Sequence, residues 1–116
     1  MTLNITTADN PFVVGEKQPP FEYQFKDYAG APINLLNYAA RASFRERWAA
    51  VATVDGRAAA VTDSANGKVT YTWQGDEYPT PGQWLGELWV GNGTQRYCSL
   101  LFTFLVRAPV ASVPSI

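Results

Sequence analysis

The sequence contains no histidine and only one cysteine, Cys98, among its 116 residues. Zinc sites built from His and Cys, and nucleophiles that depend on a histidine base, are therefore excluded within one chain. A single cysteine allows no intrachain disulfide, so the chain must fold by packing alone, and a reducing compartment suits it. We interpret Cys98 as a small structural core residue, because free cysteine is among the most buried residue types.

Charge is scarce as well. Only 16% of the residues are charged, and the formal net charge is −1. Nucleic acids and anionic membranes attract clustered Lys and Arg, so we expect neither as a partner. No apolar run approaches the ~20 residues of a membrane span, and residues 1–14 lack the basic and apolar regions of a secretory signal. We therefore expect a soluble product of the cytoplasm.

Apolar and aromatic residues are plentiful, at 47% and 14% of the chain. Disorder is excluded by this composition and the low net charge, and the length is typical of one domain with its own core. We predict a single domain over residues 1–107. Residues 108–116 contain Pro and Ser and are interpreted as an extended C-terminal tail.

Alternation of apolar and polar residues with period two dominates the chain and predicts short strands. The expected strands cover residues 12–15, 21–25, 38–48, 49–54, 57–62, 68–73, 84–90 and 95–106. Seven to eight strands separated by turn signals are typical of an all-β, Ig-like antiparallel sandwich with Greek-key connections. The expected core comprises Phe44, Val69, Tyr71, Trp73, Phe102, Phe104 and Val106.

Several local patterns affect this strand assignment. Residues 35–51 are rich in Ala, Leu, Arg and Glu, so a helix there is the alternative to a strand. Asp55-Gly56 lies between two β-compatible runs, which predicts a two-residue hairpin turn. Residues 63–67 (DSANG) predict a second turn, and the Pro- and Gly-containing residues 74–82 predict a loop.

The last two strands carry large apolar side chains on both faces. With Asn92-Gly93 as a two-residue turn, Leu85 and Trp89 share one face with the even-numbered apolar residues from 100 to 106. The opposite face then forms a candidate assembly surface, which comprises Trp84, Leu88, Val90, Tyr97, Leu101 and Leu105. A one-residue shift would exchange the two sets, but both faces remain apolar. The outer face is covered by loops or tail, forms a protein interface, or binds a ligand.

The remaining candidates for catalytic or binding residues give only weak signals in the sequence. Asp76, Glu77 and Glu87 could pair as glycosidase carboxylates, yet Asp76-Glu77 lies in a loop where solvated carboxylates are usual. The four Trp and six Tyr could form a sugar-stacking platform, but most fall at alternating positions expected of a core. Three arginines, at 41, 45 and 47, could bind an acidic partner or simply face solvent. We expect no catalytic residues, no cofactor and no metal site.

Residues 30–106 contain an ordered set of features. The set comprises GAPINL at 30–35, Phe44-Arg45, NGKVTYTW at 66–73, Gly75-Asp76, PGQWLGELWV at 81–90 and FTFLV at 102–106. In this order and spacing they resemble the Ig-like N-terminal domain of the bacteriophage baseplate upper protein family. The resemblance covers about two-thirds of the chain.

The resemblance implies a bacteriophage virion component that serves attachment and assembly, with no catalytic residues. Its partners would be other virion structural proteins, and the chain would form a homo-oligomer in the particle. Family members usually continue into further domains, whereas this sequence ends soon after the closing strand. That departure favours a small structural protein of the tail, the baseplate, the head–tail junction or the capsid surface. A carbohydrate-binding module for host adhesion, with a glycan as partner, is the alternative.

Overall fold

The computed structural model describes residues 2–116, which form a nearly all-β structure with 48% strand and 3% helix. The strands are β1 (Thr2–Asn4), β2 (Phe12–Val13), β3 (Phe21–Gln24), β4 (Ala39–Glu46), β5 (Val54–Asp63), β6 (Lys68–Tyr71), β7 (Gly82–Gly91), β8 (Arg96–Cys98) and β9 (Leu101–Arg107). A short 3₁₀ helix, η1 (Ser64–Asn66), precedes β6. The predicted all-β class is confirmed, and the helical alternative for residues 35–51 is wrong because β4 occupies that region.

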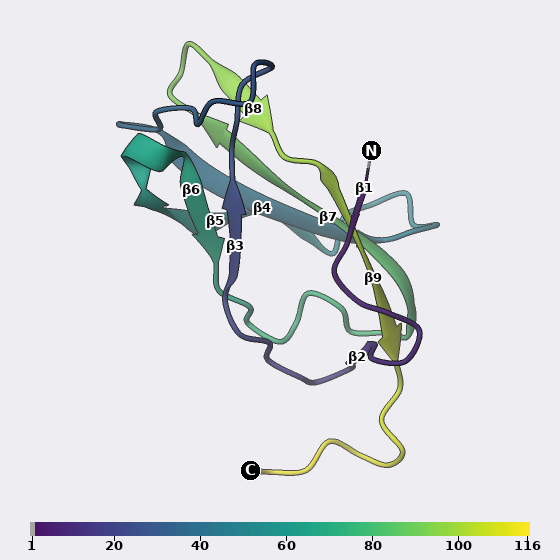
Figure 1. The fold of residues 1–116 in the computed structure, drawn as a ribbon. Coiled ribbons are helices and arrows are strands. Elements are labelled where there is room, and N and C mark those ends of the chain that lie inside the picture. The colour runs from purple at the N-terminus through teal and green to yellow at the C-terminus, as the bar shows by residue number, and fades with distance from the viewer. Residues whose placement is uncertain (1) are drawn as a thin grey trace.

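The strands form one curled, mixed sheet shaped as a half-barrel, in the order β1-β9-β7-β4-β5-β6-β3 (Figure 1). Strand β8 pairs with β7, and β2 pairs with β9. Most neighbours are antiparallel, but β1 and β2 run parallel to β9. The sheet is therefore mixed, where the sequence predicted only antiparallel pairing. No helix among residues 2–116 is long and apolar enough to cross a membrane.

Strand β5 runs through Asp55-Gly56, so the hairpin turn predicted there is wrong. The chain reverses earlier, between β4 and β5, and residues 55 and 56 together face the single residue Ser43. This arrangement is a β-bulge, in which Gly56 adopts a φ of +73° and donates its N–H to Ser43 Oγ at 3.0 Å. Positive φ at Gly serves a bulge as well as a turn, so the dipeptide alone could not distinguish them.

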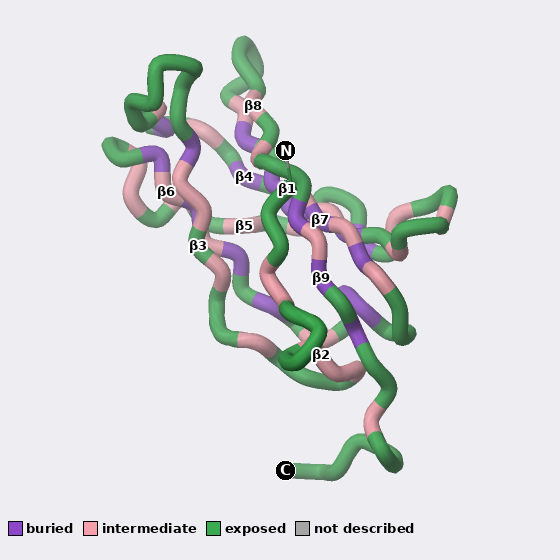
Figure 2. The backbone as a smooth tube through the Cα atoms, turned by 45° about the vertical axis from the view of Figure 1, so that its right-hand side comes forward, coloured by how far each residue is buried: buried purple, intermediate pink, exposed green. Residues whose placement is uncertain are grey.

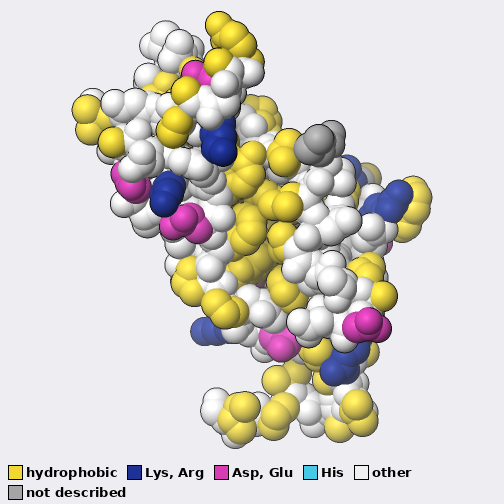
Figure 3. Space-filling view, viewed as in Figure 1, with side chains coloured by type: hydrophobic (Ala, Val, Ile, Leu, Met, Phe, Trp, Pro, Cys, Tyr) yellow, Lys and Arg dark blue, Asp and Glu magenta, His cyan; other side chains and the backbone are white. Residues whose placement is uncertain are grey.

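The core lies in the concavity of the curled sheet (Figure 2). All seven residues expected there are buried, which confirms that prediction. Alternation accounts for this outcome, because on β4 the residues Ala40, Ala42 and Phe44 face inward while Arg41 and Arg45 face solvent. On the open side of the half-barrel, hydrophobic side chains gather in a strip between β3 and β9 (Figure 3).

Candidate functional site

The pairing of β7 with β8 and β9 decides which side chains reach the outer surface. The turn is shifted by one residue from the predicted position, because the Asn92 side chain accepts the N–H groups of Thr94 and Gln95 at 3.0 and 2.8 Å. Residues Gly93 and Thr94 then occupy the tip, and Val90 pairs with Tyr97.

A second irregularity lies between β8 and β9. Ser99 donates its N–H to the Leu88 carbonyl at 2.8 Å, while Gly86 pairs with Phe102. Leu100 and Leu101 therefore both lie opposite Glu87, which is the pattern of a bulge. Because of the extra residue, the side chains of β9 that the register assumed from the sequence placed on one face of the sheet lie on the other face.

This register corrects the predicted assembly surface. Trp84, Leu88 and Val90 are buried in the core, and Tyr97 is half-buried against it. Only Leu101 and Leu105 of the predicted set lie on the outer face, where they are 36% and 38% exposed. The sequence could not reveal the added residue, because no Gly or Asn marks the bulge at 99–101.

The outer face of β4, β7 and β9 does carry large apolar side chains. Trp89 is 42% exposed, and Leu85 on the same strand is half-buried. Together with Leu101 and Leu105 they form what we call the outer apolar face. The inference that both faces of the last two strands are apolar is thus confirmed, with Leu85 and Trp89 in place of Trp84, Leu88 and Val90.

A hollow of about 460 Å³ lies on this outer face beside the β5 bulge. Its lining combines small, charged and apolar side chains and includes Arg41, Ser43, Asp55, Gly56, Glu87 and Trp89. Arg41 and Asp55 form no side-chain hydrogen bond or ion pair with any other residue in the range 2–116. Arg45, by contrast, donates to the Ala49 carbonyl at 3.0 Å and so supports the turn after β4.

Of the three candidate carboxylates, Asp76 and Glu77 both contact the Arg57 guanidinium, whereas Glu87 lies apart from them. Glu77 is fully buried and accepts hydrogen bonds from the Tyr71 hydroxyl at 2.5 Å and from the N–H groups of Gln74 and Gly75 at 2.7 and 2.9 Å. Asp76 forms a two-pronged ion pair with Arg57, whose guanidinium holds the pKa of that carboxyl below its usual range. This cluster anchors the loop after β6.

Glu87 lies on the outer face instead. It accepts the Trp89 indole N–H at 2.8 Å and the Cys98 thiol at 3.4 Å. Its contacts orient the Trp89 ring at the rim of the hollow.

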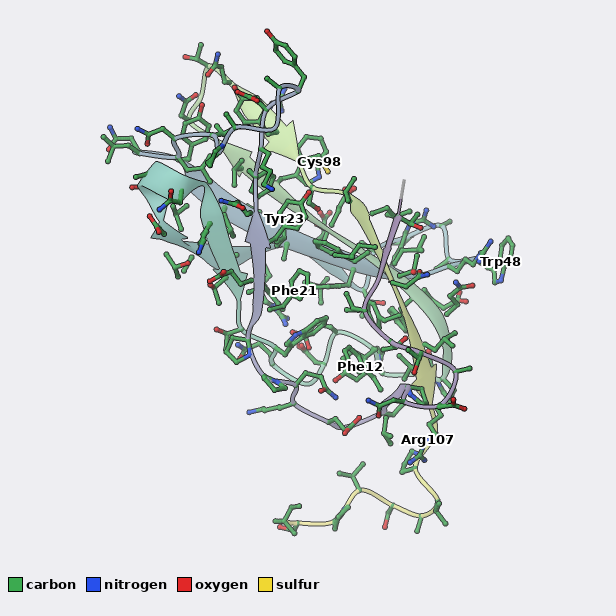
Figure 4. All side chains as sticks on the ribbon, in the orientation of Figure 1. Phe12, Phe21, Tyr23, Trp48, Cys98 and Arg107 are labelled. Carbon is green, nitrogen blue, oxygen red and sulfur yellow. The ribbon has the colours of Figure 1, made fainter. Side chains whose placement is uncertain are left out.

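Most aromatic side chains are in the core, as expected, but a few are strongly exposed. Trp48 is 80% exposed at the turn between β4 and β5, where it points away from the sheet (Figure 4). The Arg47 guanidinium lies 5.0 Å from the centre of its ring. Tyr28 is fully exposed on another loop. The exposed aromatic rings therefore do not form one continuous platform.

Cys98 is exposed, so the prediction that it is a core residue is wrong. It is the last residue of β8 and lies opposite Trp89, just before the bulge at Leu100 and Leu101. Partial loss of hydration, followed by the negative charge of Glu87, raises the pKa of its thiol to about 12.

We expect Cys98 to react slowly with thiol reagents despite its exposure, because the thiolate is the reactive form. At pH 8 its rate constant should be at least about tenfold below that of free cysteine. Replacing Glu87 with Gln removes the nearby charge and should accelerate the reaction at the same pH. Following the reaction of a chromogenic disulfide with both proteins between pH 7 and 10 measures this. Equal rates for Cys98 and free cysteine would contradict the raised pKa.

No protein-family model matches the chain, and a comparison with curated proteins found no match.

Proposed function

We propose that this chain is a non-enzymatic structural protein of a bacteriophage virion and that it acts through protein–protein assembly. The outer apolar face is the observation that carries the proposal. Leu101, Leu105 and Trp89 are each more than a third exposed on neighbouring strands. These exposed apolar side chains on neighbouring strands support an interaction site, because large apolar patches on soluble proteins mark such sites. The resemblance of residues 30–106 to the baseplate upper protein domain supports the virion as the setting.

The finer fold in this proposal is an Ig-like Greek-key sandwich. In this proposal, the neighbouring strands β9, β7 and β4 belong to one layer, β6 and β3 belong to the other, and β5 connects the two. Across the two layers, the Phe21 ring lies 4.8 Å from the Phe102 ring and the Tyr23 ring lies 5.6 Å from it. This packing supports two facing layers, and such a rigid unit suits the tail, the baseplate, the head–tail junction or the capsid surface.

Placing charge on the outer apolar face should block assembly without unfolding the protein. We expect Leu101→Lys and Leu105→Lys to shift the melting temperature by only a few degrees, because both side chains are already partly solvated. Incorporation into particles, or self-association measured by light scattering, should fall sharply because a lysine at an apolar interface must lose its hydration.

Val110→Lys is the matched control, because Val110 lies in the tail and is 98% exposed. It should leave both measurements unchanged. Leu88→Lys should instead prevent folding, since Leu88 is buried. Loss of thermal stability in step with loss of assembly in the Leu101 and Leu105 variants would show that this face is ordinary core.

A carbohydrate-binding module is the second candidate, favoured by the placement of Trp89 at the hollow. Arg41, Asp55 and Glu87 line the same hollow and could bind sugar hydroxyls while the Trp89 ring stacks on a pyranose. A glycan array decides between the two functions. Binding that disappears in Trp89→Ala, from a protein that joins no particle, would favour carbohydrate binding over assembly.

A further inference from the structure

The charged side chains of the outer face are arranged in rows across the strands. Arg41 on β4 pairs directly with Trp89 on β7. The next row of side chains that face outward is two residues further along β4. In it, Ser43 on β4 pairs with Glu87 on β7, and Asp55 in the β5 bulge lies on the other side of Ser43. A basic and aromatic row is thus adjacent to an acidic row, and outward rows are separated by about 6.7 Å along the strands.

We propose that a second copy of this chain docks face to face on this surface. The two-fold axis lies parallel to the face, runs across the strands and passes between the two rows. This inference rests on the proposed assembly function and names its partner. Each copy then places Arg41 between Asp55 and Glu87 of the other, and each places Trp89 in the other copy's hollow. An interface of this kind is self-complementary, because every contact occurs twice.

The charges of the face support this arrangement. Arg41 and Asp55 lack a side-chain partner within residues 2–116, so each is free to pair across the interface. The hollow has small residues, Ser43 and Gly56, among its lining, and this leaves space for the incoming Arg41 side chain. The same axis places Arg45 opposite Ala39 of the other copy, because Ala39 occupies the outward row beyond Arg41. Arginine therefore does not face arginine at that row.

The apolar side chains add to the charge pairing. Leu85 is in the row after Glu87, and Leu101 lines the hollow from β9. Burying these residues around a central aromatic ring is the usual composition of an interface core, with charged groups at its rim. The pairing thus covers Leu85, Trp89 and Leu101 of the outer apolar face.

A charge-swap experiment tests the pairing on the full chain. Sedimentation equilibrium should show a reversible dimer for the wild type. Arg41→Glu alone and Asp55→Arg alone should each raise the dimer dissociation constant about tenfold or more, because each places like charges in contact across the interface. The double variant, Arg41→Glu with Asp55→Arg, should recover part of the lost affinity, because it restores opposite charges at positions 41 and 55 but leaves carboxylates at positions 41 and 87 in contact.

Lys26→Glu is the control of equal charge change, because Lys26 is exposed outside this face. It should leave the dissociation constant unchanged. Single variants that dimerise as well as the wild type, or a double variant weaker than both, would overturn the pairing. A wild type that is monomeric at about 1 mM would also overturn it.

Failure of the pairing differs from failure of the proposed function. A monomeric wild type whose entry into particles is blocked by Leu101→Lys refutes the two-fold pairing and leaves the assembly function intact. A dimer with the expected charge-swap behaviour that enters no particle supports the pairing and refutes the virion function.

Discussion

Replacing Trp73 with alanine is expected to lower the free energy of unfolding by about 3–5 kcal/mol, the range for large buried aromatics. Trp73 is only 5% exposed and lies at the centre of the aromatic core. Its ring centre lies 5.1 to 5.9 Å from those of Phe12, Phe44, Tyr71, Tyr78 and Phe104. Truncation would leave a cavity shared by these rings, and the melting temperature should fall by about 10 °C or more.

Urea unfolding followed by circular dichroism measures the effect. Trp48→Ala is the matched control, because it removes the same side chain from an exposed turn, and its unfolding free energy should stay within about 0.5 kcal/mol of wild type. Equal effects of the two substitutions would contradict the placement of Trp73 at the centre of the core.

The second large effect is expected at Glu77, where replacement by glutamine should cost about 3–5 kcal/mol. The buried carboxylate accepts hydrogen bonds from one hydroxyl and two backbone N–H groups. It also lies 3.5 Å from Arg57. Glutamine preserves the shape but presents an NH₂ group to donors, so at least one buried donor would lose its partner.

Asp76→Asn provides the comparison at the adjacent position. The Asp76 side chain is 63% exposed, so its pair with Arg57 is largely solvated and the variant should lose less than about 1 kcal/mol. Denaturant titrations of both variants measure the difference. If Asp76→Asn proves the more destabilising, the loop after β6 is not anchored by Glu77.

The all-β class and the core could be predicted because they depend on alternation, which is a local property. Val69, Tyr71 and Trp73 alternate with polar residues, and all three are buried. Parallel pairing of β1 and β2 with β9 could not be predicted, since it joins the two ends of the described chain and β1 has only three residues. No periodicity of the sequence encodes which distant strand a short edge strand selects.

The candidate site was only half predictable for a related reason. The excess of Trp and Leu in residues 84–106 indicated an apolar outer face, and the structure has one. Its members depended on the bulge at Leu100 and Leu101, where a single added residue exchanges the two faces. The hollow required Asp55-Gly56 to form a bulge in place of a turn. Both outcomes depend on pairing between strands, so neither can be read from one strand alone.

The parallel strands at the N-terminal end have a consequence for the order of events in synthesis. Leu105 donates its N–H to the Thr6 hydroxyl, and the two residues are 99 positions apart. At about 5–20 residues per second, a ribosome needs roughly 5–20 s between making these two partners. During that interval residues 2–14, which include Phe12, cannot pair with β9, because β9 has not yet been synthesised. Non-local pairing is slow even afterwards, so docking of the N-terminal strands onto β9 should be the final, rate-limiting step of folding.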